Sequence, residues 1–310
     1  MDTFYPRLIV WHLSDAKTVE TFSTQECLLT IESIAKVSKP IVVLTGAKVL
    51  GRPDIYQIIE YGFALGLKMI VEALLRELTD DVVRRFKVFG PKVFRVLVDE
   101  SIVEDNGTRY RQTPFFRELE DAVLRLKNTG YELHLVATIA SPDLRKFAFY
   151  HDYAFRRSAQ GLYCHLHING THTNGNARRI DEFIEAIARM KTFSPKQMYV
   201  SPQCVKYGLN HAAGSQHHYI EVHAEEGNAE WKQWCLAGRS FAFINPTGKV
   251  QMCGGIQLDC GDLRANNFDF KTIWESSELL DCVRARERSC EDMRSCINQL
   301  YSVQVPDVKS

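Results

Sequence analysis

Short apolar runs alternate with amphipathic stretches along the first two thirds of the chain. Each run is too short for a buried helix and is rich in β-branched residues, which is typical of a buried parallel strand. The runs cover residues 7–13, 40–46, 67–73, 92–98, 131–139 and 161–168. The stretches between them have helical character and cover residues 24–37, 53–66, 79–88, 114–128 and 142–158. The pattern therefore predicts six β–α repeats.

One more helix is predicted over residues 178–191, after the sixth apolar run. Repeated β–α units favour an α/β fold with a parallel sheet. With six repeats we expect a partial (β/α)6 TIM-like barrel, whose ligands bind at the carboxyl ends of the strands.

The character of the sequence changes after the strand-like residues 197–201. Residues 202–230 contain Gly, Asn, His and Glu without apolar periodicity, so we expect a linker there. The segment "FAFINPTGKVQMC" predicts a hairpin that turns at Pro246–Gly248, and a helix is expected over residues 271–286. The predicted domains are thus a barrel over residues 1–201, a linker over 202–230, and a small cysteine-rich α+β domain over 231–310.

Composition narrows the range of partners. The 38 Lys and Arg residues balance 38 Asp and Glu residues. A nucleic-acid partner bound by bulk electrostatics requires surplus cations, so none is expected. The chain has no apolar run of about 18 residues and no signal-peptide pattern, so no membrane partner is expected and the predicted location is cytoplasmic.

Nine cysteines are present, and six of them lie between residues 235 and 296. In a reducing compartment such a group favours a metal site over disulfides. Four thiolates complete a typical iron–sulfur or zinc site. The candidate ligands are Cys235, Cys253, Cys260, Cys290 and Cys296. Cys282 falls inside a predicted helix beside two leucines and is interpreted as a packing residue; buried, inert cysteines are the alternative for the whole group.

The tail resembles the SPASM domain, the auxiliary-cluster module of radical SAM maturases. The resemblance rests on "CLAGRSFAFINPTGKVQMC" and on "GDLRANNFDFKTIWESSELLDCVRARERSC". A full domain of this kind has seven cysteines for two clusters, whereas this chain has Glu287 and Leu300 at two cysteine positions. The resemblance implies one [4Fe–4S] cluster, held by Cys235, Cys253, Cys260 and one of Cys290 or Cys296; zinc is the alternative.

With this tail, the β–α body resembles a radical SAM partial barrel. That family has three cysteines after its first strand, which hold a [4Fe–4S] cluster that chelates S-adenosylmethionine (AdoMet). Here the corresponding residues 14–20 read "SDAKTVE", and Cys27 is alone. The family also ends its second strand with Gly-Gly-Glu-Pro, whereas this chain keeps Gly46 and continues with Ala47 and Lys48. Two elements of one site are missing together, so the resemblance implies a degenerate member that does not cleave AdoMet.

Histidines and an arginine suggest further sites. His165 and His167 alternate on a predicted strand, so both can point into the barrel, and Asp99 ends another strand. They could bind a divalent metal ion, although a polar barrel lining is the favoured interpretation. Lys48, Arg95 and barrel-facing histidines could instead form a cationic pocket for an anionic ligand.

Three functional hypotheses follow. The leading one is a pseudoenzyme or accessory protein that binds an active paralogue, a peptide or a cofactor precursor. The second is a metal-dependent enzyme that uses His165, His167 and Asp99. The third is a small-molecule binding protein that uses the former cofactor pocket at Gly46 and Lys48, with Lys48 selecting an anion.

Overall fold

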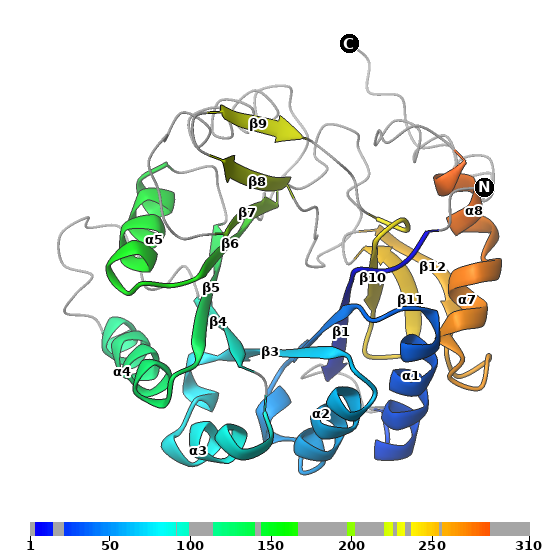
Figure 1. Ribbon diagram of the computed structural model, residues 1–310, viewed down its shortest axis with the longest axis horizontal. Helices are drawn as coiled ribbons and strands as arrows, with labels where there is room; N and C mark the ends of the chain where they lie inside the picture. Colours follow the sequence, from blue (N-terminus) through cyan, green and yellow to red (C-terminus); the bar gives the residue numbers. More distant parts are fainter. Residues whose placement is uncertain are drawn as a thin grey trace. The chain divides into compact units, whose positions relative to one another are not determined.

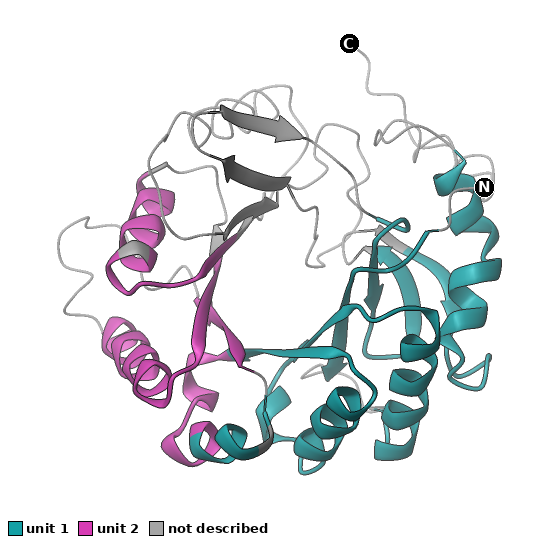
Figure 2. Cartoon of the chain, viewed as in Figure 1, with its two compact units in different colours: residues 1–73, 84–91, 236–310 teal, residues 74–83, 92–235 magenta. Residues whose placement is uncertain are grey.

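The chain folds into two compact units that are interleaved in the sequence (Figure 2). Unit 1 comprises residues 1–73, 84–91 and 236–310, and unit 2 comprises residues 74–83 and 92–235. The computed structural model describes residues 4–14, 22–90, 92–98, 114–139, 144–166, 197–201, 220–225, 228–232, 237–253 and 256–285. In these residues no helix combines the length and the apolar character that crossing a membrane requires.

Unit 1 is an α/β layer in which the two ends of the sequence share one sheet (Figure 1). Its strands are β1 (Leu8–Ser14), β2 (Ile41–Gly46), β3 (Lys68–Leu74), β10 (Phe241–Ile244), β11 (Lys249–Cys253) and β12 (Ile256–Asp262). Its helices are α1 (Thr24–Val37), α2 (Ile55–Ala64), α7 (Phe270–Ser276) and α8 (Glu278–Arg284), with a 3-10 turn η1 (Val49–Gly51). Strand β1 pairs in parallel with both β2 and β10, whereas β10, β11 and β12 are antiparallel.

Unit 2 repeats the β–α pattern. Its strands are β4 (Val93–Val98), β5 (Glu132–Ile139), β6 (Gly161–Leu166), β7 (Gln197–Ser201), β8 (Ile220–Glu225) and β9 (Asn228–Lys232). Its helices are α4 (Pro114–Thr129) and α5 (Leu144–Arg156), with a 3-10 turn η2 (Leu75–Glu77), and helix α3 (Asp80–Phe89) begins in this unit and continues in unit 1. Strands β4 to β7 are parallel, and β8 and β9 follow in antiparallel pairing.

Local sequence signals explain where helix α1 begins. Ser23 accepts a hydrogen bond from the amide of Glu26, and the Glu26 carboxylate accepts one from the amide of Ser23. This reciprocal capping satisfies two amides that the first turn leaves without partners. Directly before the helix, the Phe22 ring packs edge-on against Trp11 of β1, with ring centroids 5.1 Å apart.

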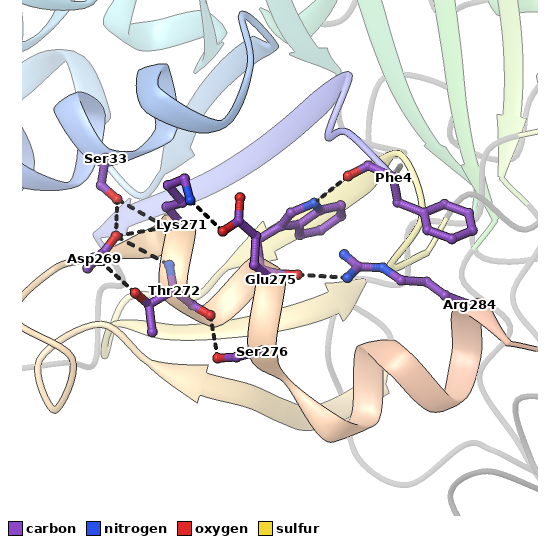
Figure 3. Close-up of polar contacts among 9 residues, drawn as sticks. Phe4, Ser33, Asp269, Lys271, Thr272, Glu275, Ser276 and Arg284 are labelled. Atoms are coloured by element: carbon purple, nitrogen blue, oxygen red, sulfur yellow. Dashed lines mark hydrogen bonds and ion pairs between the residues drawn. The ribbon is translucent and has the colours of Figure 1, made fainter. Parts of the chain in front are cut away.

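The C-terminal segment is anchored on the first helix of unit 1 (Figure 3). Asp269 caps α7 by accepting bonds from the amides of Lys271 and Thr272, and it also accepts a 2.6 Å bond from the Ser33 hydroxyl of α1. The buried Trp274 side chain donates from its indole nitrogen to the Phe4 carbonyl. The tail is therefore part of the same core as the N-terminal strands.

Most predicted elements are confirmed, with three differences. The predicted linker 202–230 contains β8 and the start of β9; residues 220–224 alternate apolar and polar side chains, which is typical of a strand. The predicted helix 271–286 is two helices, since Ser277 has an extended backbone between them. Residues 231–310 were expected as a separate domain, but β10 pairs with β1, and the described residues from 237 to 285 belong to unit 1. The predicted helix 178–191 lies outside the described residues.

Candidate functional site

Two hydrogen bonds join the carboxyl ends of β1 and β2 in unit 1. The Ser14 hydroxyl donates to the Ala47 carbonyl at 2.7 Å, and the Ala47 amide donates to the Ser14 carbonyl at 2.9 Å. Gly46 makes this approach possible, because its φ is +134° and a Cβ atom there would lie 2.4 Å from the Ser14 carbonyl oxygen. The predicted site residue Gly46 is thus in contact with the strand that precedes it.

Lys48 follows directly in the left-handed region, with φ +57°, and starts the turn η1. Its side chain is exposed, whereas Val49 and Leu50 beside it are buried. The structure therefore presents an ammonium group to solvent just beyond the end of β2. Whether this cation binds a ligand stays a prediction.

Cys27 lies in α1 and is fully buried. Burial raises the pKa of its thiol to about 12, against a smaller opposing effect of the Arg52 guanidinium. Without a metal the thiol is protonated at neutral pH, and it lies inside the core of unit 1 rather than at the end of a strand.

Arg52 fixes the start of α1. Its guanidinium donates to both carboxylate oxygens of Asp54 and to the Phe22 carbonyl, and the Thr24 hydroxyl donates to Asp54 at 2.8 Å. Hydrogen bonds from Arg52 and Thr24 hold the pKa of the Asp54 carboxyl below its usual value despite the opposing effect of burial. A charged network therefore orders the residues that follow the segment 15–21.

Three polar side chains occupy neighbouring positions on one face of β1, β2 and β3. Strand pairing places His12 opposite Thr45, and the Thr45 hydroxyl donates to the Glu72 carboxylate at 3.0 Å. Glu72 is 7% exposed, so this carboxylate is held inside unit 1. Thr45 and Glu72 were not predicted as site residues, although a charged residue inside the apolar run 67–73 is a signal that the sequence contains.

The candidate cysteine ligands are only partly described. Cys253 ends β11 and its backbone pairs with Ile256. Cys260 is the extra residue of a β-bulge in β12, and it lies close enough to the Arg284 guanidinium of α8 to act on its pKa. Cys282 is half-buried in α8, in agreement with a packing role. Cys235, Cys290 and Cys296 lie outside the described residues.

The predicted histidine site also stays a prediction. His165 belongs to β6, where only its backbone is described, and Asp99 and His167 lie outside the described residues. Within the residues that the structure describes, no three His, Cys, Asp or Glu side chains are grouped to hold a metal ion.

A second buried polar cluster lies in unit 2. The Arg95 guanidinium stacks over the Tyr163 ring, 4.1 Å from its centroid, and the Tyr163 hydroxyl is 3.4 Å from Nδ1 of His134. The three residues are 4%, 4% and 6% exposed, respectively. Arg95 was predicted as a site residue and Tyr163 was not, because an aromatic residue in an apolar strand gives no polar signal.

Most of the chain is similar to proteins named AdoMet-dependent heme synthase. No family model matches it. The AdoMet-dependent heme synthase of Nitratidesulfovibrio vulgaris is 24% identical over 273 residues, which span 86% of this chain and 74% of that relative. The AdoMet-dependent heme synthase of Methanosarcina barkeri is 22% identical over 315 residues, which span 91% of this chain and 86% of that relative.

Solved structures share the fold. Streptococcus suis SuiB, also solved bound to S-adenosylmethionine, superposes with a TM-score of 0.60 and 10% identity over 91% of this chain and 68% of that chain. The protein anSMEcpe, with bound AdoMet and Cp18Cys peptide, has a TM-score of 0.52 and 9% identity over 96% of this chain and 97% of that chain. At these identities the likeness shows the fold alone, and it confirms the predicted α/β class with parallel strands followed by C-terminal antiparallel strands.

Proposed function

We propose that this chain, a relative of the radical SAM superfamily, binds a tetrapyrrole without cleaving AdoMet and serves as an accessory protein to an active enzyme. The ligand class is taken from the relatives named AdoMet-dependent heme synthase. A tetrapyrrole is one form of the cofactor precursor that the sequence analysis proposed.

The state of Cys27 carries the proposal. The family cluster needs three thiolates beside the first strand, and the first 163 residues of this chain contain one cysteine. That cysteine is buried in α1, and a single thiol cannot supply three ligands. The residues present after β1 therefore do not fit a [4Fe–4S] cluster that chelates AdoMet.

The end of β2 supports the same conclusion. In the family, the backbone and the acid at this position meet the amino group of AdoMet. Here the Ala47 carbonyl and amide both bond to Ser14, and the next side chain is the exposed cation Lys48. A cation disfavours binding of an ammonium group, because like charges repel.

The C-terminal cysteines give the protein a second proposed property. We propose that Cys235, Cys253 and Cys260, with Cys290 or Cys296, hold one auxiliary [4Fe–4S] cluster. The electrostatic effect between Cys260 and the Arg284 guanidinium supports this assignment, because a cation stabilises a thiolate. Zinc is the alternative occupant, and sulfide content distinguishes the two.

Anaerobically purified protein tests the lost activity. We would incubate it with AdoMet and dithionite and measure 5′-deoxyadenosine by liquid chromatography and mass spectrometry. The heme synthase of Methanosarcina barkeri, treated in parallel, is the positive control. We expect product from the control and none from this chain. Formation of 5′-deoxyadenosine by this chain would contradict the proposal.

Iron, sulfide and zinc content test the auxiliary cluster. We expect about four irons and four sulfides per chain with an absorption band near 400 nm. Cys260→Ser should lower the iron content, whereas Cys282→Ser, in the neighbouring helix, should not. Equal iron content in both variants would remove Cys260 from the ligand set.

Absorbance titration with heme tests the proposed ligand. We expect a saturable shift of the Soret band at a stoichiometry of one heme per chain. A spectrum that stays equal to that of free heme would exclude a tetrapyrrole and favour a protein or peptide partner.

A further inference from the structure

Arg284 of α8 is held by four contacts within unit 1. Its Nε donates to the Gly238 carbonyl at 2.8 Å, and its Nη1 donates to the Trp274 carbonyl at 2.7 Å. Its Cζ lies 4.4 Å from the centroid of the Trp274 ring and 5.6 Å from that of the Phe4 ring, and Figure 3 shows Arg284 beside Phe4. A planar guanidinium with two carbonyl acceptors and two aromatic neighbours is fixed in orientation.

One nitrogen of this guanidinium has no acceptor. Nη2 is buried and makes no hydrogen bond within the part of the chain that the structure describes. The Asp281 carboxylate, which is largely exposed, approaches Nη1 at 4.0 Å and leaves Nη2 unsatisfied. A buried, charged N–H group without an acceptor is unfavourable, because nothing replaces the hydration that it loses on folding. An acceptor is therefore expected next to Nη2.

An electrostatic effect connects this guanidinium to Cys260, a candidate cluster ligand. Burial lowers the pKa of Arg284, and a negative charge on Cys260 opposes that shift. Opposite charges act on each other in this way at short range. Cys260 is the extra residue of the bulge in β12, and the backbone beside it lies close to the tail helices, since a Cβ on Gly261 would be 2.7 Å from Cγ2 of Ile273 in α7. The sulfur atom and the guanidinium thus share one local environment.

A cluster bound at Cys260 would supply the acceptor that Nη2 lacks. Iron–sulfur clusters present sulfide and thiolate sulfurs, and hydrogen bonds to these sulfurs are among the factors that set the reduction potential. The direction follows from charge: the cluster gains one negative charge when it takes up an electron, and a cationic donor stabilises that charge. The guanidinium is always protonated, and water screens a buried charge only weakly.

We propose that Arg284 donates a hydrogen bond from Nη2 to a sulfur atom of the auxiliary cluster and thereby raises its reduction potential. The inference rests on the auxiliary cluster of the proposed function, and it adds the residue that adjusts the potential of that cluster. The donor is a side chain that the fold fixes independently, through Gly238, Trp274 and Phe4, so its position does not depend on the cluster.

Pulsed electron paramagnetic resonance tests the contact directly. The full chain would be produced with ¹⁵N-labelled arginine, purified anaerobically and reduced with dithionite. The reduced cluster should show a weak ¹⁵N hyperfine coupling, which Arg284→Lys should lose because lysine carries no label. Phe4→Leu is the matched control, since it removes one ring beside the guanidinium and keeps the donor, and it should retain the coupling.

Absence of an arginine coupling in the wild type would overturn the inference, and so would a coupling that persists in Arg284→Lys. Should Arg284→Lys not retain iron, Arg239→Lys decides instead. Arg239 is buried in the same unit and donates to the Val283 carbonyl at 2.7 Å. The coupling should survive Arg239→Lys; its loss there would assign the contact to Arg239 and overturn the role of Arg284.

A redox titration followed by the same resonance measures the consequence. At a fixed solution potential the ratio of reduced to oxidised cluster should be at least about 10-fold lower in Arg284→Lys than in the wild type, which is about 59 mV for a one-electron couple. Phe4→Leu should lower the melting temperature and leave the potential unchanged. Equal potentials in the wild type and Arg284→Lys would overturn the inference, because a purely structural role of Arg284 affects stability alone.

Metal analysis separates the two levels of the argument. A wild-type chain without iron and sulfide, or with zinc instead, would overturn the auxiliary cluster of the proposed function and this inference together. A chain that holds the cluster but shows no arginine coupling would overturn the role of Arg284 and leave the cluster assignment intact.

Discussion

The Ser33 hydroxyl of helix α1 donates a 2.6 Å hydrogen bond to the carboxylate of Asp269, the residue that caps helix α7 (Figure 3). The two residues are 236 positions apart in the sequence. The Lys271 amide donates in turn to the Ser33 oxygen at 3.0 Å. Ser33 is 6% exposed, so one buried hydroxyl connects the N-terminal and C-terminal segments of unit 1.

We expect Ser33→Ala to lower the free energy of unfolding by about 2 kcal/mol, because it removes a buried bond to a charged acceptor. Urea denaturation at pH 7 measures this. Ser276→Ala is the matched control: its exposed hydroxyl bonds only within α7 to the Thr272 carbonyl, and we expect a change within about 0.5 kcal/mol. Equal losses in the two variants would contradict a special role for Ser33.

The hydrogen bond between Ser33 and Asp269 should make the effect of Ser33→Ala on stability depend on pH. The Ser33 bond is the largest effect on the Asp269 carboxyl and lowers its pKa. A carboxyl with a lowered pKa in the folded state adds stability above its unfolded pKa of about 3.9, and that stability is lost as pH falls through the folded pKa. The difference between Ser33→Ala and the wild type should therefore be largest at pH 7 and smaller at pH 3. A difference that grows on acidification would contradict this assignment.

Local patterns were sufficient to predict most elements of the fold. The helix predicted over residues 24–37 has the observed bounds, and in the structure Ser23 and Glu26 form a local capping box at its start. The division of the tail was not predictable in this way. Pairing of β10 with β1 joins residues more than 200 positions apart, and no local pattern encodes which strand becomes the neighbour.

The candidate site was predicted in part for the same reason. The absence of three cysteines after the first strand was legible in the sequence, and so was an arginine inside the run 92–98. The burial that protonates Cys27, and the stacking of Arg95 on Tyr163, depend on contacts between separate strands and helices. Such contacts set pKa values and cluster geometry only once the chain is folded.

Gly46 should tolerate no side chain. In Gly46→Ala a Cβ atom would lie 2.4 Å from the Ser14 carbonyl oxygen, and the backbone would be held at φ +134°, which alanine rarely adopts. We expect a loss of about 3 kcal/mol or more in urea denaturation. Gly130→Ala is the control, since Gly130 has φ +81° but no atom within 4 Å of an added Cβ, and its cost should be about 1 kcal/mol. Similar costs would show that backbone conformation alone, without the contact to Ser14, determines the effect.

His134 should make the chain less stable in mild acid. Its folded pKa of about 3 lies below the unfolded value of about 6.5, so the unfolded state takes up a proton first as pH falls. Stability from the neutral imidazole is complete above pH 6.5 and is lost between pH 6.5 and 3, with about 2 kcal/mol lost at pH 5. Urea denaturation of the wild type and of His134→Asn should show this loss in the wild type only.

A nuclear magnetic resonance titration of the His134 ring protons checks the same prediction without a substitution. The resonances should not shift between pH 8 and pH 5. A midpoint near pH 6.5 would mean that the imidazole is not desolvated, and it would contradict the predicted loss of stability in mild acid.

Arg284 should not be replaceable by lysine. Its guanidinium donates from Nε to the Gly238 carbonyl at 2.8 Å and from Nη1 to the Trp274 carbonyl at 2.7 Å, while Cζ lies 4.4 Å from the centroid of the Trp274 ring. A lysine ammonium is a single point and cannot reach both carbonyls while stacking on the ring. We expect Arg284→Lys to lower the free energy of unfolding by about 2 kcal/mol.

The indole of Trp274 supplies a site-specific measurement of this loss. Its N–H donates to the Phe4 carbonyl at 3.0 Å, so it should exchange slowly with solvent in the wild type and faster in Arg284→Lys. Arg7→Lys, an exposed replacement in the same unit, should leave both the exchange rate and the stability unchanged. If Arg284→Lys exchanged as slowly as the wild type, packing of Trp274 against Phe270 would be sufficient to hold the tail on the N-terminal strands, and the two carbonyl contacts would be dispensable.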